Sequence, residues 1–129
     1  MDVYSLSKYS YLLQKDVSYP IKLPKSNAKK TEKYDHLIEI IAKKYDVDSN
    51  LIKAIISVES SFNKNAVSHK GAVGLMQLIP ETSKLMGIDD PTNAYENISA
   101  GTKYLKMQLS KFKNLDHAIA AYNCGMISG

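Results

Sequence analysis

Apolar residues recur at three- and four-residue steps through most of the chain after residue 33, which is the period of helices that bury one face. The first such run covers residues 34–45. Asp48 then stands where the N-cap of a second helix belongs, and this helix is expected to end near Glu59 or Ser60. The first half of the chain is therefore predicted to hold two amphipathic helices.

The second half of the chain predicts three further helices. Pro80 and Gly87 suit the first turn and the C-terminal end of a short helix. Two longer apolar stripes follow, one at Ile98, Thr102, Leu105, Leu109 and Phe112, the other at Leu115, Ala118, Ile119 and Tyr122. Residues 61–75 are rich in Asn and Gly, which predicts a loop with at most a small β-hairpin. No long alternating run occurs, so the fold class is mainly α.

Residues 1–32 differ from the rest of the chain and are predicted to form an N-terminal arm or linker. They contain Pro20, Pro24 and a lysine cluster with no sustained period. We interpret the lysines as a solvated face, with a polyanion contact as the less favoured alternative. Residues 33–129 are then expected to form one helical domain, because 129 residues are enough for a single modest core.

The composition excludes several classes of protein. A hydrophobic content of 44% is ordinary for a globular domain, and no apolar run approaches the roughly 20 residues that span a bilayer. Residues 1–16 lack the basic and apolar regions of a secretory signal. One cysteine and three scattered histidines offer no disulfide and no metal-ligand spacing, so we expect no metal and no cofactor. The formal charge of +4 favours an anionic partner only weakly.

A carboxylate continues the buried stripe of the second helix. Ile52, Ile55 and Ile56 fall at i, i+3 and i+4, and the next position on that stripe is Glu59. Burying an ionised carboxylate is costly, so a glutamate held there favours its protonated form and can donate a proton as a general acid. The competing interpretation is a glutamate at a frayed helix end that points to water. The helix alone leaves both open.

Three short segments stand out in the predicted loop and near the helix ends: Glu59-Ser60, Gly74-Leu75-Met76-Gln77 and Ala121-Tyr122-Asn123. Their order and spacing are together far more specific than any one of them. With the run Asn97–Gly101, they resemble the motifs of the soluble lytic transglycosylase family, which is related in fold to goose-type lysozyme. The resemblance runs from about Tyr34 to the C-terminus and implies a lysozyme-like helical domain.

This resemblance implies a peptidoglycan lytic transglycosylase. The family cleaves the β-1,4 bond between N-acetylmuramic acid and N-acetylglucosamine without water and leaves a 1,6-anhydromuramyl end. Glu59 is then expected to be the single acid/base, which protonates the glycosidic oxygen and later takes a proton from the sugar's 6-hydroxyl. Most glycosidases need two carboxylates, yet residues 60–80 contain no Asp or Glu. A second carboxylate would have to fold back from Glu81, Asp89, Asp90 or Glu96.

The resemblance also assigns five substrate-binding residues. Ser68 matches a family serine near the catalytic centre, and Gln77 offers an amide that suits an N-acetyl sugar. Tyr122 is expected to place its hydroxyl against the catalytic acid. Ser60 is expected to set the local hydrogen bonding, and Asn123 to hold sugar or loop backbone. Taken without the family, each of these also fits an ordinary loop or core position.

Two alternatives stay open: a hydrolytic lysozyme on the same fold, and a catalytically weak glycan-binding module. The chain ends at Gly129, whereas family members usually continue through another helix, so a domain shortened at its C-terminus is expected. The expected partner is the glycan strand of peptidoglycan, with a cell-envelope or secretion-apparatus protein as an open second partner. We expect no nucleic acid and no integral membrane segment. The expected location is the cell envelope, the periplasm or the cell exterior.

Overall fold

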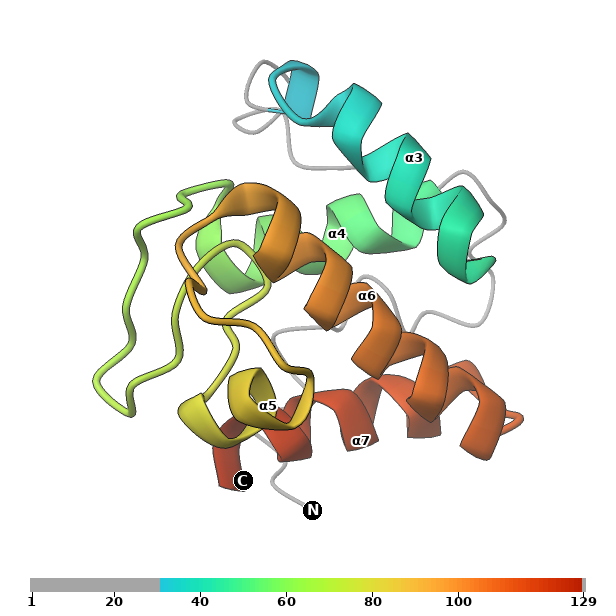
Figure 1. The fold of residues 1–129 in the computed structure, drawn as a ribbon. Coiled ribbons are helices and arrows are strands. Elements are labelled where there is room, and N and C mark those ends of the chain that lie inside the picture. Colours follow the sequence, from blue (N-terminus) through green and yellow to red (C-terminus); the bar gives the residue numbers. More distant parts are fainter. Residues whose placement is uncertain (1–30, 129) are drawn as a thin grey trace.

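The computed structural model describes residues 31–128, and the side chains of residues 31–123. Its helices are, in chain order, α3 (Asp35–Tyr45), α4 (Ser49–Ser60), α5 (Pro80–Leu85), α6 (Ala94–Lys111) and α7 (Leu115–Ser128). Helix α6 contacts both α3 and α7, and α3 also packs on α4. Figure 1 shows α6 passing between α3 and α7, with the long loop between α4 and α5 at one side of the molecule. The predicted mainly α fold class is confirmed.

The first two helices begin and end where local chemistry requires. Helix α3 ends because Asp46 adopts a left-handed conformation with φ of 54°. Helix α4 begins after Asp48, whose side chain accepts a hydrogen bond of 2.7 Å from the Asn50 amide. This is the N-cap that the sequence predicted. The two helices are therefore joined by a turn of three residues, which keeps α4 close beneath α3.

The core is formed by the helix faces that the apolar periodicity predicted. Ile52, Ile55 and Ile56 of α4 are fully buried, as are Ala118, Ile119 and Tyr122 of α7. One detail of the prediction is wrong: Phe112 is not the last helical residue of the α6 stripe. It is the C-cap, with extended backbone at φ −115° and ψ 122°, so its side chain leaves the helical face. Within residues 31–128 no helix is long and apolar enough to cross a membrane.

The segment between α4 and α5 is the loop that the sequence predicted, and its small hairpin is reduced to isolated β-bridges. Val73 pairs with both Val67 and Leu78 in these bridges. Short helix α5 follows, with Pro80 at its first position and Gly87 just beyond its end at φ +74°. Residues 1–30 lie outside the described part of the chain, so the N-terminal arm or linker over 1–32 stays a prediction.

Candidate active site

Glu59 lies in the last turn of α4, on the stripe of buried isoleucines, and its side chain is half-buried. The chain turns sharply just after it, because Ser61 and Phe62 both adopt left-handed conformations with φ of 50° and 63°. Phe62 is itself buried, and its ring stacks on Tyr34 with 6.3 Å between ring centroids. The helix end that carries Glu59 is therefore anchored by packing against α3, which is the opposite of a frayed end.

Ser60 joins the end of α4 to the loop segment 74–77. Its Oγ lies 2.8 Å from the Leu75 carbonyl oxygen and 3.1 Å from the Ile56 carbonyl oxygen, as donor in both cases. A hydroxyl has one proton, so this donor is already shared between two backbone acceptors. The predicted role of Ser60 in local hydrogen bonding agrees with this geometry.

Segment 74–77 is a closed four-residue turn. The amide and carbonyl of Val73 bond to the carbonyl and amide of Leu78 at 2.9 and 3.0 Å, and the Gln77 amide donates to the Gly74 carbonyl at 3.1 Å. Gly74 has φ of +86°, and a Cβ at this position would collide with the Asn97 side chain and the Pro91 carbonyl. The turn therefore requires glycine for both backbone conformation and space.

Gln77 is buried in this turn rather than extended on the surface. Its side-chain Nε2 donates to the Ala66 carbonyl at 3.0 Å and to the Gly74 carbonyl at 2.9 Å. Both amide hydrogens thereby tie the turn to the loop, and Oε1 is left as the polar atom that can meet a ligand. The sequence predicted Gln77 as a residue that both donates and accepts, and the structure assigns its donors to the protein.

Ser68 organises the outer part of the same loop. Its Oγ accepts hydrogen bonds from the amides of Lys70 and Ala72 at 3.2 and 3.0 Å. Its own amide donates to the Ala72 carbonyl at 2.9 Å, and Gly71 between them has φ of +87°. Ser68 is half-buried, and its hydroxyl hydrogen remains able to donate to a ligand.

Tyr122 lies at the centre of the site on α7 and is fully buried. Its hydroxyl donates to the Met76 carbonyl at 3.1 Å, and its ring packs against Tyr104 with 5.6 Å between ring centroids. Burial raises the pKa of Tyr122 well above its ordinary value, and the charge of Glu59 and then Tyr104 raise this pKa further. The hydroxyl therefore stays protonated, and Glu59 lies within its electrostatic reach. That Tyr122 places its hydroxyl against the catalytic acid stays a prediction.

Asn123 follows directly on α7 and is 1% exposed. Neither its Nδ2 nor its Oδ1 has a hydrogen-bond partner among the residues that the structure describes. Buried amides are normally paired, because an unpaired polar group costs free energy. Its predicted role, to hold sugar or loop backbone, stays a prediction.

Asn97 supports the candidate site from α6, and the sequence reasoning named it only as part of a motif. Its side chain is fully buried and bonds to three backbone groups. Oδ1 accepts from the Met76 amide at 2.8 Å, while Nδ2 donates to the carbonyls of Val73 and Pro91 at 3.0 and 2.8 Å. The signal in the sequence was a polar residue next to Ile98, which belongs to the buried stripe. The residues that Asn97 binds are distant in sequence, so this signal did not identify them.

Helix α6 thus fixes Met76 and, through it, Tyr122. A Cβ on Gly101 would meet the Met76 side chain, and Thr102 Oγ1 lies 3.8 Å from the Met76 sulfur. The Met76 amide is bound by Asn97, and the Met76 carbonyl receives the Tyr122 hydroxyl. The Tyr122 hydroxyl is therefore positioned by a chain of contacts that begins at α6.

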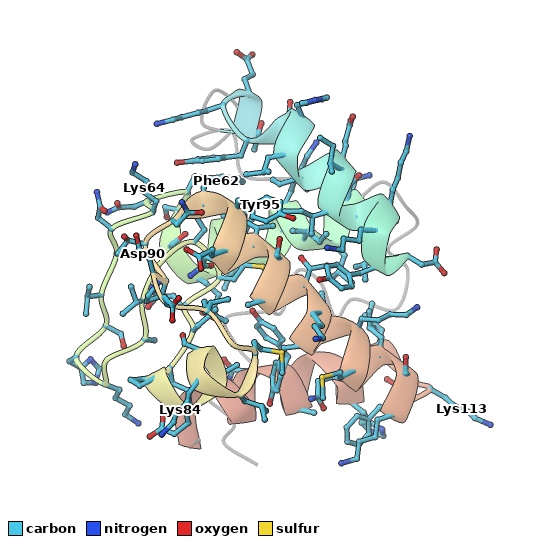
Figure 2. All side chains as sticks on the ribbon, in the orientation of Figure 1. Phe62, Lys64, Lys84, Asp90, Tyr95 and Lys113 are labelled. Atoms are coloured by element: carbon cyan, nitrogen blue, oxygen red, sulfur yellow. The ribbon has the colours of Figure 1, made fainter. Side chains whose placement is uncertain are left out.

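Two of the four carboxylates that could serve as a second catalytic group, Asp90 and Glu96, contact other residues of the chain. Asp90 accepts hydrogen bonds from the hydroxyl and the amide of Thr92 at 2.6 and 3.0 Å, and these bonds lower its pKa. Glu96 Oε1 lies 3.4 Å from the Asp89 amide. Both serve the turn that leads into α6, where Figure 2 shows Asp90 beside the long loop. No contact in the described part of the chain brings either of them to Tyr122.

The helices and the site together define a lysozyme-like helical domain. A half-buried glutamate at a helix end lies within electrostatic reach of a buried tyrosine, and the turn 74–77 is hydrogen-bonded to that tyrosine and to Ser60. The chain belongs to the transglycosylase SLT domain family, whose model matches residues 36–128. The family prediction made from the sequence is confirmed.

Individual relatives of the chain are named as transglycosylases. The chain is 38% identical over 122 residues to the membrane-bound lytic murein transglycosylase C of Photorhabdus laumondii, an alignment that covers 80% of this chain and 34% of the relative. It is 38% identical over 96 residues to membrane-bound lytic murein transglycosylase F of Desulfosudis oleivorans, covering 69% and 21%. It is 35% identical over 81 residues to the transglycosylase of Enterobacteria phage PRD1, covering 63% and 31%. The chain thus spans about a third or less of the length of these relatives.

Proposed function

We propose that this chain is a peptidoglycan lytic transglycosylase of the cell envelope, with Glu59 as its single acid/base. The observation that carries the proposal is the Glu59–Tyr122 pair. Within the described residues, Glu59 is the one carboxylate whose charge acts on the buried Tyr122 hydroxyl. Relatives named as lytic murein transglycosylases support the substrate class and the location.

The proposed reaction proceeds without water. Glu59 donates its proton to the glycosidic oxygen as the bond from that oxygen to C1 of N-acetylmuramic acid breaks. The 6-hydroxyl of the same sugar then attacks C1, and its proton passes to Glu59. The new O6–C1 bond gives the 1,6-anhydro end, and Glu59 is again protonated for the next cycle. The sugar's N-acetyl oxygen stabilises C1 between the two steps, so no second carboxylate is required.

The binding residues contribute in different ways to this proposal. Gln77 offers Oε1 to the N–H of an N-acetyl group, because both its amide hydrogens are held by the loop. Ser68 offers its hydroxyl hydrogen, since its oxygen accepts from the loop amides. Asn123 keeps the role of holding sugar or loop backbone in this proposal, and its two buried polar atoms have no partner among the described residues. Ser60 and Tyr122 hold the turn 74–77 in position, because their hydroxyl groups donate hydrogen bonds to its backbone carbonyls.

The products of digestion test the proposal directly. Purified peptidoglycan treated with the full 129-residue chain is expected to release muropeptides that are one water lighter than reducing-end products. These products should also resist reduction by borohydride. Mass spectrometry before and after borohydride treatment measures both properties.

Other outcomes of that experiment contradict the proposal in distinct ways. Reducing ends would mean a hydrolytic lysozyme, and the search would turn to a second carboxylate. Binding to peptidoglycan without any product would mean a glycan-binding module.

Tyr122→Phe is expected to slow cleavage about tenfold, because the variant loses the hydrogen bond from the Tyr122 hydroxyl to the Met76 carbonyl beside the catalytic acid. The same variant should change how stability depends on pH. Since the pKa of Tyr122 is raised in the folded state, its contribution to stability is complete below the ordinary tyrosine pKa of about 10 and is lost as pH rises above it. The destabilisation of Tyr122→Phe relative to the parent, measured by urea unfolding, should therefore shrink above about pH 10.

Tyr95→Phe is the matched control, because Tyr95 is 50% exposed on α6. This control should leave cleavage unchanged and should change the unfolding free energy only slightly, because half of the Tyr95 side chain is exposed. A Tyr122→Phe difference that does not vary with pH, together with unchanged cleavage, would remove Tyr122 from the site.

A further inference from the structure

A second concave surface lies away from Glu59, between the C-terminal end of α3 and the C-terminal half of α6. Its volume is about 520 Å³, and its lining residues are Tyr45, Lys103, Lys106, Met107, Ser110 and Lys111. The α6 members fall at i, i+3, i+4, i+7 and i+8, so they form one stripe about 12 Å long. We call this surface the lysine groove.

The charge of the lysine groove is strongly positive. Three lysines line it, and among the described residues Asp46 contacts one of them, Lys106. Lys106 Nζ lies 3.3 Å from the Asp46 carbonyl oxygen and 3.8 Å from its carboxylate. The Asp46 side chain is fully exposed, so this ion pair is weak and leaves the ammonium group able to pair with another anion. Lys103 and Lys111 are exposed on either side of it along α6.

Helix electrostatics account for only part of this arrangement. Lys111 stands in the last turn of α6, where a cation favourably meets the helix dipole. Lys103 and Lys106 lie in the middle of an 18-residue helix, where the dipole effect has faded. Lys103 and Lys106 stand at i and i+3, where like charges repel each other slightly, and an anion outside the helix would offset this repulsion.

The groove is also apolar at its centre. Met107 is 46% exposed between the lysines, and the half-buried Tyr45 ring lies on the α3 side. A polyanion that is hydrated along its whole length gains little binding free energy from these apolar side chains. An amphiphile, with an anionic head joined to apolar chains, meets both features at once.

The groove and the candidate active site lie at opposite ends of the domain. Glu59 is in the last turn of α4, about 15 Å along the helix axis from Ser49 at its start. Tyr45 is the last residue of α3, four positions before that start. Figure 2 shows Lys113, just after α6, at one side of the domain, and Lys64 in the long loop and Lys84 on α5 at the other side.

We propose that the lysine groove binds the headgroup of an anionic phospholipid presented by a bilayer. The ammonium groups of Lys103, Lys106 and Lys111 pair with lipid phosphates, and the Met107 side chain enters the interface beside the acyl chains. A domain held in this way directs the Glu59 end away from the bilayer. The inference is independent of the proposed reaction, because membrane docking needs no peptidoglycan.

Vesicle co-sedimentation of the full chain tests the inference. Vesicles of phosphatidylglycerol and phosphatidylcholine should bind the protein, pure phosphatidylcholine vesicles should not, and added salt should weaken binding. The triple variant Lys103→Gln, Lys106→Gln, Lys111→Gln should lower the partition coefficient about a hundredfold, roughly fivefold for each lysine. Met107→Gln should lower it several-fold, whereas Leu85→Gln, at a site 69% exposed on α5, should not.

The matched control removes the same charge at the other end of the domain. Lys64→Gln, Lys70→Gln, Lys84→Gln also lowers the formal charge by three, from +4 to +1. Equal losses in both triple variants would mean that net charge alone drives binding, and this would overturn the inference. So would binding that survives the groove variant, or a soluble glycerol phosphate polymer that binds the groove while vesicles do not. Thermal unfolding of both variants shows that each is folded.

Discussion

Glu59→Gln is expected to abolish cleavage of peptidoglycan while the fold stays intact. The amide is close in size to the carboxyl group but has no proton to donate to the glycosidic oxygen, and general acid–base catalysis is worth about 10²- to 10⁴-fold for a single group. In a one-acid mechanism both proton transfers use the same side chain, so the loss is expected at or beyond the upper end of this range. The rate of muropeptide release, followed by mass spectrometry, is the measurement.

Stability should respond little to this substitution. Glu59 is half-buried at the helix end, and the anchoring contacts at that end come from Ser60, Ser61 and Phe62. We expect the unfolding free energy to change by less than about 1 kcal/mol, as for most substitutions outside a buried network. A Glu59→Gln variant that is folded and inactive therefore separates catalysis from stability.

Glu81→Gln is the control for this prediction. Glu81 is exposed in the first turn of α5, and it is one of the carboxylates that the sequence left as a second catalytic group. Unchanged cleavage in this variant supports a single acid. Turnover retained in Glu59→Gln, or lost in Glu81→Gln, would contradict the one-acid assignment and favour a hydrolase with two carboxylates.

The helices were predictable because their signals are local. The stripe of α4, the Asp48 cap and the Pro80 and Gly87 boundaries each depend on residues within about two turns of one another. The position of Glu59 on that stripe, and of Tyr122 on the α7 stripe, could be read in the same way. Phe112 shows the limit, because the helix ends one residue earlier than its apolar periodicity suggests.

The hydrogen bonds that assemble the site were not predictable from these local patterns. Asn97 reaches Met76 across 21 positions, and Tyr122 reaches it across 46. The donors of Gln77 are committed to the loop only because segment 74–77 folds back on Ala66. Such pairings depend on how α6 and α7 pack together, and a periodic pattern fixes the buried face of a helix but not its partners.

Asn97→Asp is the second substitution for which we expect a large effect. The new carboxyl group keeps an acceptor for the Met76 amide but loses both N–H donors, so its second oxygen faces the carbonyls of Val73 and Pro91. Losing these bonds in a buried site should lower the unfolding free energy by about 2–4 kcal/mol at neutral pH. Because Met76 also positions Tyr122, cleavage should slow ten- to hundredfold at temperatures where the variant is folded.

The pH dependence of this variant distinguishes a hydrogen-bond role from a simple packing defect. Burial and the neighbouring carbonyls favour the protonated form of the new carboxyl group, which can donate to one of those carbonyls. The loss of stability should therefore shrink as pH falls toward 4 and grow as pH rises, measured as urea unfolding relative to the parent.

Asn93→Asp is the matched control, because Asn93 is the exposed N-cap of α6. Its side chain accepts a hydrogen bond from the Glu96 amide at 3.0 Å, and a carboxylate can accept this bond equally well. A pH-independent loss in Asn97→Asp with unaltered cleavage would mean that Asn97 fills space and does not position the site.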